Sequence, residues 1–497
     1  MWLIEYSNAI VILFLCVLYN ALVRREWIVH IALSTFVYPV KREDAHSIRG
    51  PSWKWIDGQC LDKFLRGREV SQKWRQYGPV YRIWSGCKPE IVITRPEDVR
   101  AFHSDSKSHA KSKSSNGGWL FHQLLGDCMG LVNGEPWKEL RAQYNAAFVH
   151  RAVVDITPFL VHRADEYVKQ IQQVDTGVIQ LCAADAFSRY PFMATAEYLY
   201  GPLTESEKEE LWSLGQRSLA LMEKVLAGGV FRYKASRWLK PQVHKQLAAF
   251  EKDWTQFNER IVQTRGVSGP SSPAMVQAWE AAVGKGKVSK KQMVQTLSEM
   301  LFANLDVSTH TLSWLIIFLA RHPDIQNELR EEVRENKDCL VELCGKKDSL
   351  LHHCLWESIR LRPFTAFTIP ESSPQTKLLG GYIVPPHTTV VVDTMSINHN
   401  PEFWGGDCDD FNPHRLEKLS TTDLRYNLFA FGFGSRKCLG QHFGEAMMKS
   451  VACQLLAQYD LGMPFDGNKT DLDSAHLKDT WVPISDVEIT LTPLGAF

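Results

Sequence analysis

We expect a mainly α-helical protein with small β-sheets, built as one large domain behind an N-terminal transmembrane helix. Three observations predict this fold class. Between Trp137 and Glu335, apolar residues recur at helical spacing, as in Lys291–Leu319. Strand-type runs are short and gather around residues 80–94 and 382–392. An apolar run of about 20 residues, the length that crosses a bilayer, stands at the N-terminus.

The composition is that of an ordinary globular protein. The 497 residues carry no net formal charge, which gives no reason to expect nucleic acid as a partner. The 11 cysteines lack paired spacing, which favours a reducing compartment over a disulfide framework. Because one hydrophobic core rarely exceeds roughly 250–300 residues, several cores or a large cofactor should organise the chain. We expect a monomer whose bulk faces the cytosol.

The N-terminal residues differ from the rest. Residues 3–23 are apolar but for a few polar positions, and Arg24–Arg25 then place the C-terminal side in the cytosol. A buried helix or a cleaved signal peptide is the alternative, although Glu5 stands where a signal peptide would be basic. Residues 27–40 are apolar but short for a crossing, which favours an interfacial segment. We therefore expect an anchor over residues 1–25, an interfacial segment and linker over 26–50, and one domain over 51–497.

The strand signals are few. Val80–Trp84 and Glu90–Thr94 read as two strands joined by a turn, and Tyr382–Val384 and Thr388–Val392 as two later ones around a Pro-Pro turn. Ser104–Gly118 is rich in Ser, Lys and Gly, which predicts a loop with solvated basic residues. We expect a small sheet on the N-terminal side and little late strand structure.

One cysteine carries the chemical signal. Residues 431–440 read FGFGSRKCLG and present Cys438 just before a predicted helix, Gln441–Tyr459. The helix N-terminus and Arg436 favour a thiolate there. Gly434 lets the backbone pass close to a flat group, and Phe431 can shield the sulfur from water.

A lone thiolate limits the kinds of metal site. A structural zinc ion needs four ligands, and no second Cys or His lies near Cys438 in the sequence. One axial thiolate suits haem iron, where it favours O–O cleavage. The alternative is a buried structural cysteine in a Gly-rich turn.

The segment resembles the cytochrome P450 signature F-x-x-G-x-R-x-C-x-G and matches every fixed position. The resemblance extends over residues ~50 to 497 and implies the P450 fold, with haem b held by Cys438 as axial iron ligand. The anchor is typical of microsomal members, and the chain is similar in style to P450s of fungal secondary metabolism.

Three further motifs support the resemblance. Trp137 and Arg141 match W-x-x-x-R, whose side chains share one helix face and contact a haem propionate in the family. Glu357 and Arg360 match E-x-x-R, and Arg415 a later P-x-R element. In the family these three form a buried ionic triad that supports the cysteine loop. Each motif alone would indicate only a surface pair or a helix ion pair.

The central helix departs from the family pattern A/G-G-x-D/E-T-T/S. Asp306 keeps the acid, but Val307 stands where a threonine is expected and cannot relay a proton. Ser308 offers a hydroxyl one residue later, about 100° around a helix, and could serve only if the helix bulges. We expect Asp306 and Ser308 to deliver protons, or else to satisfy the helix backbone and each other.

The resemblance implies a haem-thiolate monooxygenase that oxidises a small apolar substrate with O2 and electrons from an NADPH-dependent reductase. It would be a single-pass protein of the endoplasmic reticulum membrane with a cytosolic catalytic domain. By the same analogy, aromatic residues such as Phe302 and Phe367 would line the substrate pocket. Alternatives are desaturation, ring closure or C–C or C–N coupling without oxygen insertion, a thiolate-haem isomerase or dehydratase, and a non-catalytic haem-binding protein.

Overall fold

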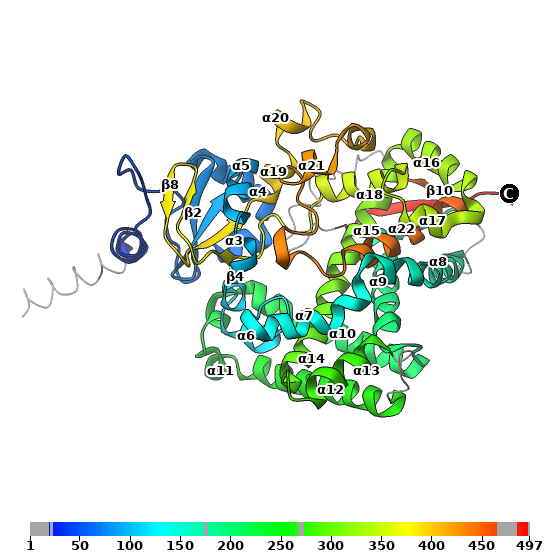
Figure 1. Cartoon of the computed structure of the whole chain (residues 1–497), viewed down its shortest axis with the longest axis horizontal. Helices are drawn as coiled ribbons and strands as arrows, with labels where there is room; N and C mark the ends of the chain where they lie inside the picture. The colour runs from blue at the N-terminus through cyan, green and yellow to red at the C-terminus, as the bar shows by residue number, and fades with distance from the viewer. Residues whose placement is uncertain (1–18, 20–22, 173–176, 267–272, 465–484, 496–497) are drawn as a thin grey trace, which may run out of the picture.

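The computed structural model describes residue 19 and residues 23–172, 177–266, 273–464 and 485–495. The predicted anchor over residues 1–25 lies almost wholly outside this part of the chain. Figure 1 shows a strand-rich region near the N-terminal part and a larger helical region beyond it. The mainly helical fold with small sheets that the sequence predicts is confirmed.

The α-helices are α2 (Arg25–Ile31), α3 (Cys60–Leu65), α4 (Gly67–Trp74), α5 (Pro96–His103), α6 (Trp119–Leu125), α7 (Gly134–Phe148), α8 (His150–Gln172), α9 (Ala183–Tyr200), α10 (Glu205–Ala227), α11 (Ser236–Leu239), α12 (Pro241–Arg265), α13 (Ala274–Trp279), α14 (Lys290–Ser298), α15 (Asn304–Arg321), α16 (Pro323–Glu335), α17 (Leu340–Gly345), α18 (Leu350–Leu361), α19 (Thr394–Asn398), α20 (Pro401–Trp404), α21 (Thr421–Leu424) and α22 (Gln441–Gln458). The π-helical turns are η1 (Ala32–Val37), η6 (Glu280–Gly284) and η7 (Glu299–Ala303), and the 3₁₀ turns are η2 (Arg75–Tyr77), η3 (Ser106–Ser108), η4 (Lys113–Asn116), η5 (Gly229–Arg232), η8 (Lys337–Cys339), η9 (Pro413–Lys418) and η10 (Gly434–Arg436).

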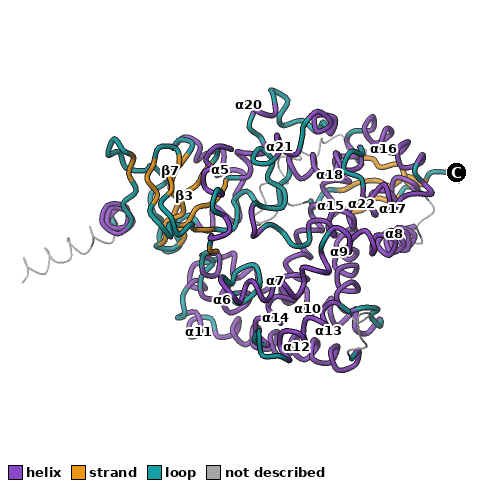
Figure 2. Tube along the Cα trace, in the orientation of Figure 1, coloured by secondary structure: helices purple, strands orange, loops and turns teal. Residues whose placement is uncertain are grey.

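The strands are β1 (Lys41–Arg42), β2 (Val80–Ser85), β3 (Lys88–Ile93), β4 (Ala110–Lys111), β5 (Ile179–Cys182), β6 (Glu371–Ser372), β7 (Lys377–Leu379), β8 (Tyr382–Val384), β9 (Thr389–Val392), β10 (Tyr459–Gly462) and β11 (Glu488–Pro493). They form sheets of order β2-β3-β9-β6-β4, β1-β8-β7 and β10-β11-β5. Figure 2 shows the strands in two separate groups, the larger at the N-terminal side.

Local sequence explains several helix boundaries. Thr204 begins α10 with a capping box to Glu207, and Ser289 begins α14 in the same way with Gln292. Pro323 opens α16, as the sequence predicts, because a proline is tolerated where the first helical N–H has no partner.

The central helix α15 is a core element. It packs against α9, where the Ser313 hydroxyl donates to the Ala183 carbonyl at 3.1 Å. Lys290–Arg321, which includes α15, is the one helical stretch among the described residues that is long and apolar enough to cross a membrane. Because three quarters of its most apolar window is buried, we assign it to the core.

A π-helical turn, η7, directly precedes α15. Such a turn bonds i to i+5 and accommodates one extra residue, so the residues after it shift around the helix axis relative to those before it. The sequence made such a bulge a condition for a role of Ser308, and the structure contains one.

One sequence expectation, about a loop, was wrong. Ser104–Gly118 is not a plain solvated loop, since it forms η3, β4 and η4, and the Lys111 side chain pairs with the Glu371 carboxylate in the interior. The two late strands lie where the sequence predicts them, as β8 and β9 on either side of a turn at Pro385, but they belong to different sheets. Strand β9 runs parallel to β3 in the middle of the N-terminal sheet, a pairing that no local pattern encodes.

Candidate active site

A tight loop presents Cys438 at the start of α22. The Cys438 N–H donates to the Phe431 carbonyl at 2.8 Å, which closes the loop. Gly432 and Gly434 have φ of 84° and 67°, a backbone conformation that glycine adopts without strain. The side chain of Phe431 packs against Trp356, 6.0 Å between ring centroids.

Cys438 lies among backbone and side-chain groups that affect its thiol. The residue is exposed, yet burial by the surrounding protein raises the pKa of its thiol, while the Gly440 N–H and Arg141 act in the opposite direction. A thiol that is both accessible and desolvated is open to a bound group rather than sealed in a core. This argues against the alternative of a buried structural cysteine.

Trp137, Arg141 and Arg436 come together beside this loop. The Arg436 guanidinium carbon lies 4.6 Å from the Trp137 ring centroid. Arg436 also donates to the Gly130 and Val132 carbonyls at 3.1 and 3.0 Å. Arg141 donates to the Lys437 carbonyl at 3.1 Å. Helix α7 and the loop before it are thereby attached to the cysteine loop.

Glu357, Arg360 and Arg415 meet at one buried carboxylate. Arg360 donates two hydrogen bonds to Glu357, at 2.7 and 2.8 Å, and Arg415 Nε donates to it at 2.9 Å. The side chains of Glu357 and Arg360 are 0% exposed. Both arginines also bind backbone carbonyls, Arg360 those of Asn398 and Cys408 and Arg415 that of Trp404. The three side chains hold the chain before the cysteine loop against α18.

A family model described as cytochrome P450 matches residues 50–485. The chain belongs to the cytochrome P450 family. Curated relatives over nearly the whole chain are named as monooxygenases of this family. The chain is 40% identical to "Cytochrome P450 monooxygenase sirC" of Leptosphaeria maculans, over 92% of this chain and 90% of the relative. It is 37% identical to "Cytochrome P450 monooxygenase hasH" of Aspergillus fumigatus, over 89% and 84% respectively. This chain is therefore a P450 monooxygenase.

The donor set of this P450 fits haem. Among the described residues, one group of side chains could hold a metal ion, and it consists of His103, His109 and Glu371. Cys438 does not belong to this group. An accessible, single thiolate suits an axial iron ligand better than a multidentate site. A Cβ on Gly440 would meet nothing within 4 Å, which leaves open space beside the cysteine.

Gly434 has a different reason to be glycine. A Cβ there would lie 2.5 Å from Ser106 Oγ and 2.6 Å from Ser106 Cβ. The structure thus explains Gly434 by the close approach of η10 to η3, where the Ser435 hydroxyl also donates to the Ser106 carbonyl at 3.2 Å.

The His103–His109–Glu371 group is an ion-pair network rather than a metal site. His109 bonds Asp105 at 2.9 Å and Glu371 at 3.2 Å, and Lys111 also pairs with Glu371. Burial alone would raise the pKa of Glu371, but Lys111 and the His109 hydrogen bond outweigh it and hold that pKa at about 2. The lysine already neutralises the carboxylate that a cation would need.

On the central helix, Asp306 Oδ1 lies 3.2 Å from His310 Nε2. His310 Nδ1 lies 2.7 Å from the Ser485 hydroxyl. Ser308 is buried at 5% exposure and has interactions of its own. Sequence reasoning missed His310 and Ser485. The i, i+4 spacing of Asp306 and His310 was a signal that could have identified His310. No local sequence pattern points to Ser485.

One expectation about the surroundings of the site needs correction. Phe302 packs in the core, where its ring is tilted against that of Trp254 with 4.7 Å between the centroids, and Phe367 packs at 5.8 Å against Trp74. These two rings therefore support the core rather than a pocket. The Arg436 guanidinium points inward to Trp137 and backbone carbonyls, whereas Lys437 is exposed.

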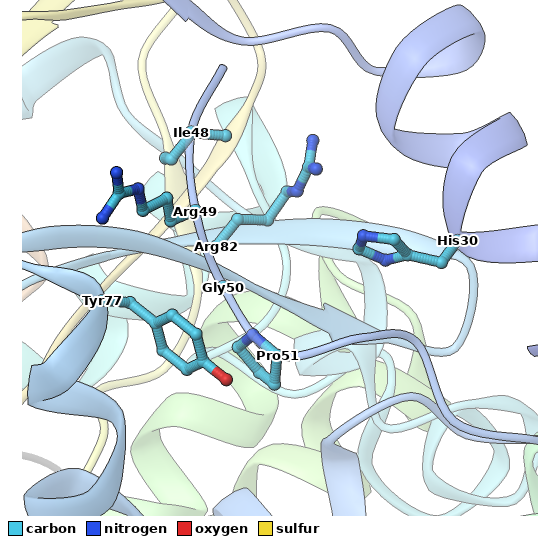
Figure 3. A pocket seen from close by; sticks show the side chains of 7 residues that line it. All are labelled: His30, Ile48, Arg49, Gly50, Pro51, Tyr77 and Arg82. Atoms are coloured by element: carbon cyan, nitrogen blue, oxygen red, sulfur yellow. The ribbon is translucent and has the colours of Figure 1, made fainter. Parts of the chain in front are cut away.

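A separate pocket of about 220 Å³ lies between α2 and β2, lined by His30, Ile48, Arg49, Gly50, Pro51, Tyr77 and Arg82. Figure 3 shows the Arg49 and Arg82 guanidinium groups pointing in different directions, so they do not converge on one ligand. None of the residues expected at the reaction centre lines this pocket.

Proposed function

We propose that this P450 is a membrane-anchored haem-thiolate monooxygenase that oxidises a small, apolar, secondary-metabolite substrate. Electrons would come from an NADPH-dependent reductase and oxygen from O2. The observation that carries the proposal is the accessible Cys438 thiol at the end of the family's cysteine loop. Relatives from Leptosphaeria and Aspergillus support a fungal biosynthetic role.

Haem b would be held by Cys438 as the iron ligand, with Trp137, Arg141 and Arg436 on its propionate side. The thiolate-ligated haem supplies oxygen activation when bound. Around it, the chain's own residues have defined tasks. Phe431 and Trp356 pack beside the loop, and the Gly440 N–H donates to the sulfur and favours its anionic form.

We further propose that Asp306 and Ser308 move protons on the central helix. The π-helical turn η7 supports this, because it shifts the residues that follow it around the helix axis by about one position. That shift could turn the Ser308 hydroxyl toward the direction that a threonine at position 307 would have in an unbroken helix.

The second candidate function rests on Val307. Valine has no hydroxyl at the position where the family places a threonine, so the side chain of Val307 cannot hold or pass on a proton. Desaturation, ring closure or C–C or C–N coupling without oxygen insertion would follow if a substrate radical reacts in another way before oxygen is transferred to it. Product analysis under ¹⁸O₂ separates the two, since only oxygen insertion labels the product.

Lys437 is the exposed basic residue next to the cysteine and a candidate contact for an acidic reductase. On the membrane side, α2 and η1 have no buried residues, which supports an interfacial role for residues 26–50 behind an anchor over residues 1–25. We propose a single-pass protein of the endoplasmic reticulum with its catalytic domain in the cytosol.

The carbon monoxide difference spectrum of the reduced protein tests haem ligation. We expect the red-shifted Soret band of a thiolate ligand in the parent and its loss in Cys438→Ser. Cys87→Ser is the matched control, because Cys87 is also exposed but lies in the turn between β2 and β3. A thiolate band that survives in Cys438→Ser, or its absence in folded parent protein, contradicts the proposal.

A further inference from the structure

Two backbone N–H groups of the loop between α6 and α7 donate to side chains of the helical segment that leads into α15. The Met129 N–H donates to Thr296 Oγ1 at 3.0 Å, and the Gly130 N–H donates to Glu299 Oε2 at 2.9 Å. Thr296 lies on α14 and Glu299 begins η7, so both side chains lie on one side of this helical segment. A partly buried N–H group loses free energy when its acceptor is removed, so Glu299 fixes the backbone at Gly130.

The carbonyl groups of the same loop accept hydrogen bonds from Arg436. Arg436 Nη2 donates to the Gly130 carbonyl at 3.1 Å and to the Val132 carbonyl at 3.0 Å. Its Nη1 donates to Asn133 Oδ1 at 3.2 Å. Gly130 is therefore held from two directions, at its N–H by Glu299 and at its carbonyl by Arg436 of the cysteine loop.

The contact between Gly130 and Glu299 leaves no room for a side chain at position 130. A Cβ there would collide with Glu299 Oε1. Glycine therefore lets the backbone come close to the carboxyl group. Because the two residues are in contact, a displacement of Glu299 moves Gly130, and with it the carbonyl that orients the Arg436 guanidinium.

We propose that Glu299 positions the Arg436 guanidinium for a haem propionate by holding Gly130 in place. This inference rests on the proposed function, which puts Arg436 on the propionate side of haem. A guanidinium binds a carboxylate through N–H groups in a fixed planar fork, so a shift of the carbonyls that orient it weakens that bond. Glu299 acts through Arg436 and is therefore a positioning residue rather than a catalytic one.

The rate at which haem leaves the protein measures how firmly the propionate is held. The full-length protein in vesicles is mixed with an excess of haem-free myoglobin, which takes up the released haem, and the transfer is followed by absorbance. Glu299→Met keeps the length of the side chain but removes its oxygen acceptors, whereas Glu299→Gln keeps an amide oxygen for the Gly130 N–H. We expect haem loss to be about tenfold faster in Glu299→Met, because a charge-assisted hydrogen bond is weakened, and to change less than about twofold in Glu299→Gln.

Two further variants separate positioning from a general loosening of the structure. In an Arg436→Ala background, Glu299→Met should change haem loss by less than about twofold, because the residue through which Glu299 acts is absent. Thr296→Val is the matched control. It removes the acceptor of the Met129 N–H in the same loop, but the Met129 carbonyl makes the longest contact with Arg436, at 3.5 Å, so haem loss should stay within about twofold of the parent.

Four results would overturn the inference. They are parent-like haem loss in Glu299→Met, an equal acceleration in Glu299→Gln, an effect of Glu299→Met that persists in Arg436→Ala, and the same acceleration in Thr296→Val. Gly130→Ala disturbs the same contact from its other side and replaces Glu299→Met if that variant does not fold. It should also speed haem loss by about tenfold, and parent-like haem loss in this variant would overturn the inference as well.

The carbon monoxide difference spectrum of the parent keeps this inference apart from the proposed function. A thiolate band in the parent, together with parent-like haem loss in Glu299→Met, removes only the role of Glu299. The absence of a thiolate band in folded parent protein counts against the proposed function instead. The two failures are therefore distinguishable.

Discussion

Glu357 is one carboxylate that two arginines share, one 3 and the other 58 positions away in the chain. A buried charge is tolerated only when partners surround it, and here guanidinium N–H groups and the Asn412 N–H occupy the carboxylate oxygens. Both arginines therefore depend on the same carboxylate for their negative partner.

We predict that Glu357→Gln destabilises the protein strongly. The neutral amide leaves two arginine charges without their carboxylate, which should lower the free energy of unfolding by about 3–5 kcal/mol. Denaturant unfolding of parent and variant measures this. Glu402→Gln, at an exposed glutamate on α20, should change it by less than about 0.5 kcal/mol. Equal effects of the two substitutions would contradict the prediction.

His352 on α18 shows how burial sets a pH limit. Desolvation, followed by repulsion from Lys449, lowers its pKa to about 2, so the folded protein keeps the ring neutral. The unfolded chain takes up a proton below about pH 6.5. The contribution of His352 to stability is therefore complete above that pH and declines as the pH falls.

We expect the unfolding free energy to fall by up to about 1.4 kcal/mol per pH unit below pH 6.5 from this residue. His352→Phe, which keeps an aromatic ring beside Trp356, should reduce the loss between pH 7 and pH 5.5 by about 1 kcal/mol. Denaturant titrations at the two pH values measure it. An unchanged difference between them would show that His352 is protonated in the folded state.

At the scale of elements, the cysteine loop is positioned from two directions. Arg415 on η9 and Arg360 on α18 hold the segment that precedes it. The turn η10 lies against η3 so closely that only a glycine fits at position 434. The loop therefore depends on two parts of the chain that are distant from it in sequence.

The two glycines of this loop should respond differently to alanine. Gly434→Ala meets Ser106 and a φ of 67°, and should cost about 1–3 kcal/mol and lower haem content. Gly440→Ala meets nothing within 4 Å at a φ of −84°, so the stability of the haem-free protein should stay within about 0.5 kcal/mol.

Thermal unfolding and haem content per protein check both variants. A loss of haem in Gly440→Ala without a loss of stability would locate the haem in that open space. Tolerance of alanine at Gly434 would instead contradict the close approach of η10 and η3.

At the scale of the molecule, residues 26–50 are joined to the domain rather than a free linker. Strand β1 pairs with β8, and the Trp53 N–H donates to His30 on α2 at 3.2 Å. On the outer side of the same segment, Trp27 and Phe36 are 62% and 79% exposed. Large exposed apolar side chains next to a predicted anchor indicate contact with a lipid surface.

We predict two levels of membrane binding. The full chain should stay with membranes in alkaline carbonate, whereas a chain without residues 1–22 should be released by carbonate but still co-sediment with vesicles at neutral pH. Replacing Trp27 and Phe36 by serine in the shortened chain should abolish co-sedimentation, because the buried apolar area is lost. Extraction of the full chain by carbonate would rule out the anchor.

Much of the fold could be predicted from local patterns. Helical spacing of apolar residues predicts α12, α14 and α15, and two short strand-type runs around a turn predict β2 and β3, because these signals lie within a few residues of the chain. The parallel pairing of β9 with β3 could not be predicted, because the two strands lie about 300 residues apart in the chain. The local sequence of neither strand specifies which strand it pairs with.

The sequence by itself determined the family, the cysteine that would hold haem and the members of the Glu357 triad. These features appear in the sequence as short motifs with fixed spacing. Within such a short segment, the geometry of the chain restricts where the side chains can lie. Only the tertiary structure decided that Lys111 is neutralised by Glu371, that Gly434 makes room for Ser106 and that Ser485 bonds His310. Each of these contacts joins segments far apart in the chain, and packing alone brings them together.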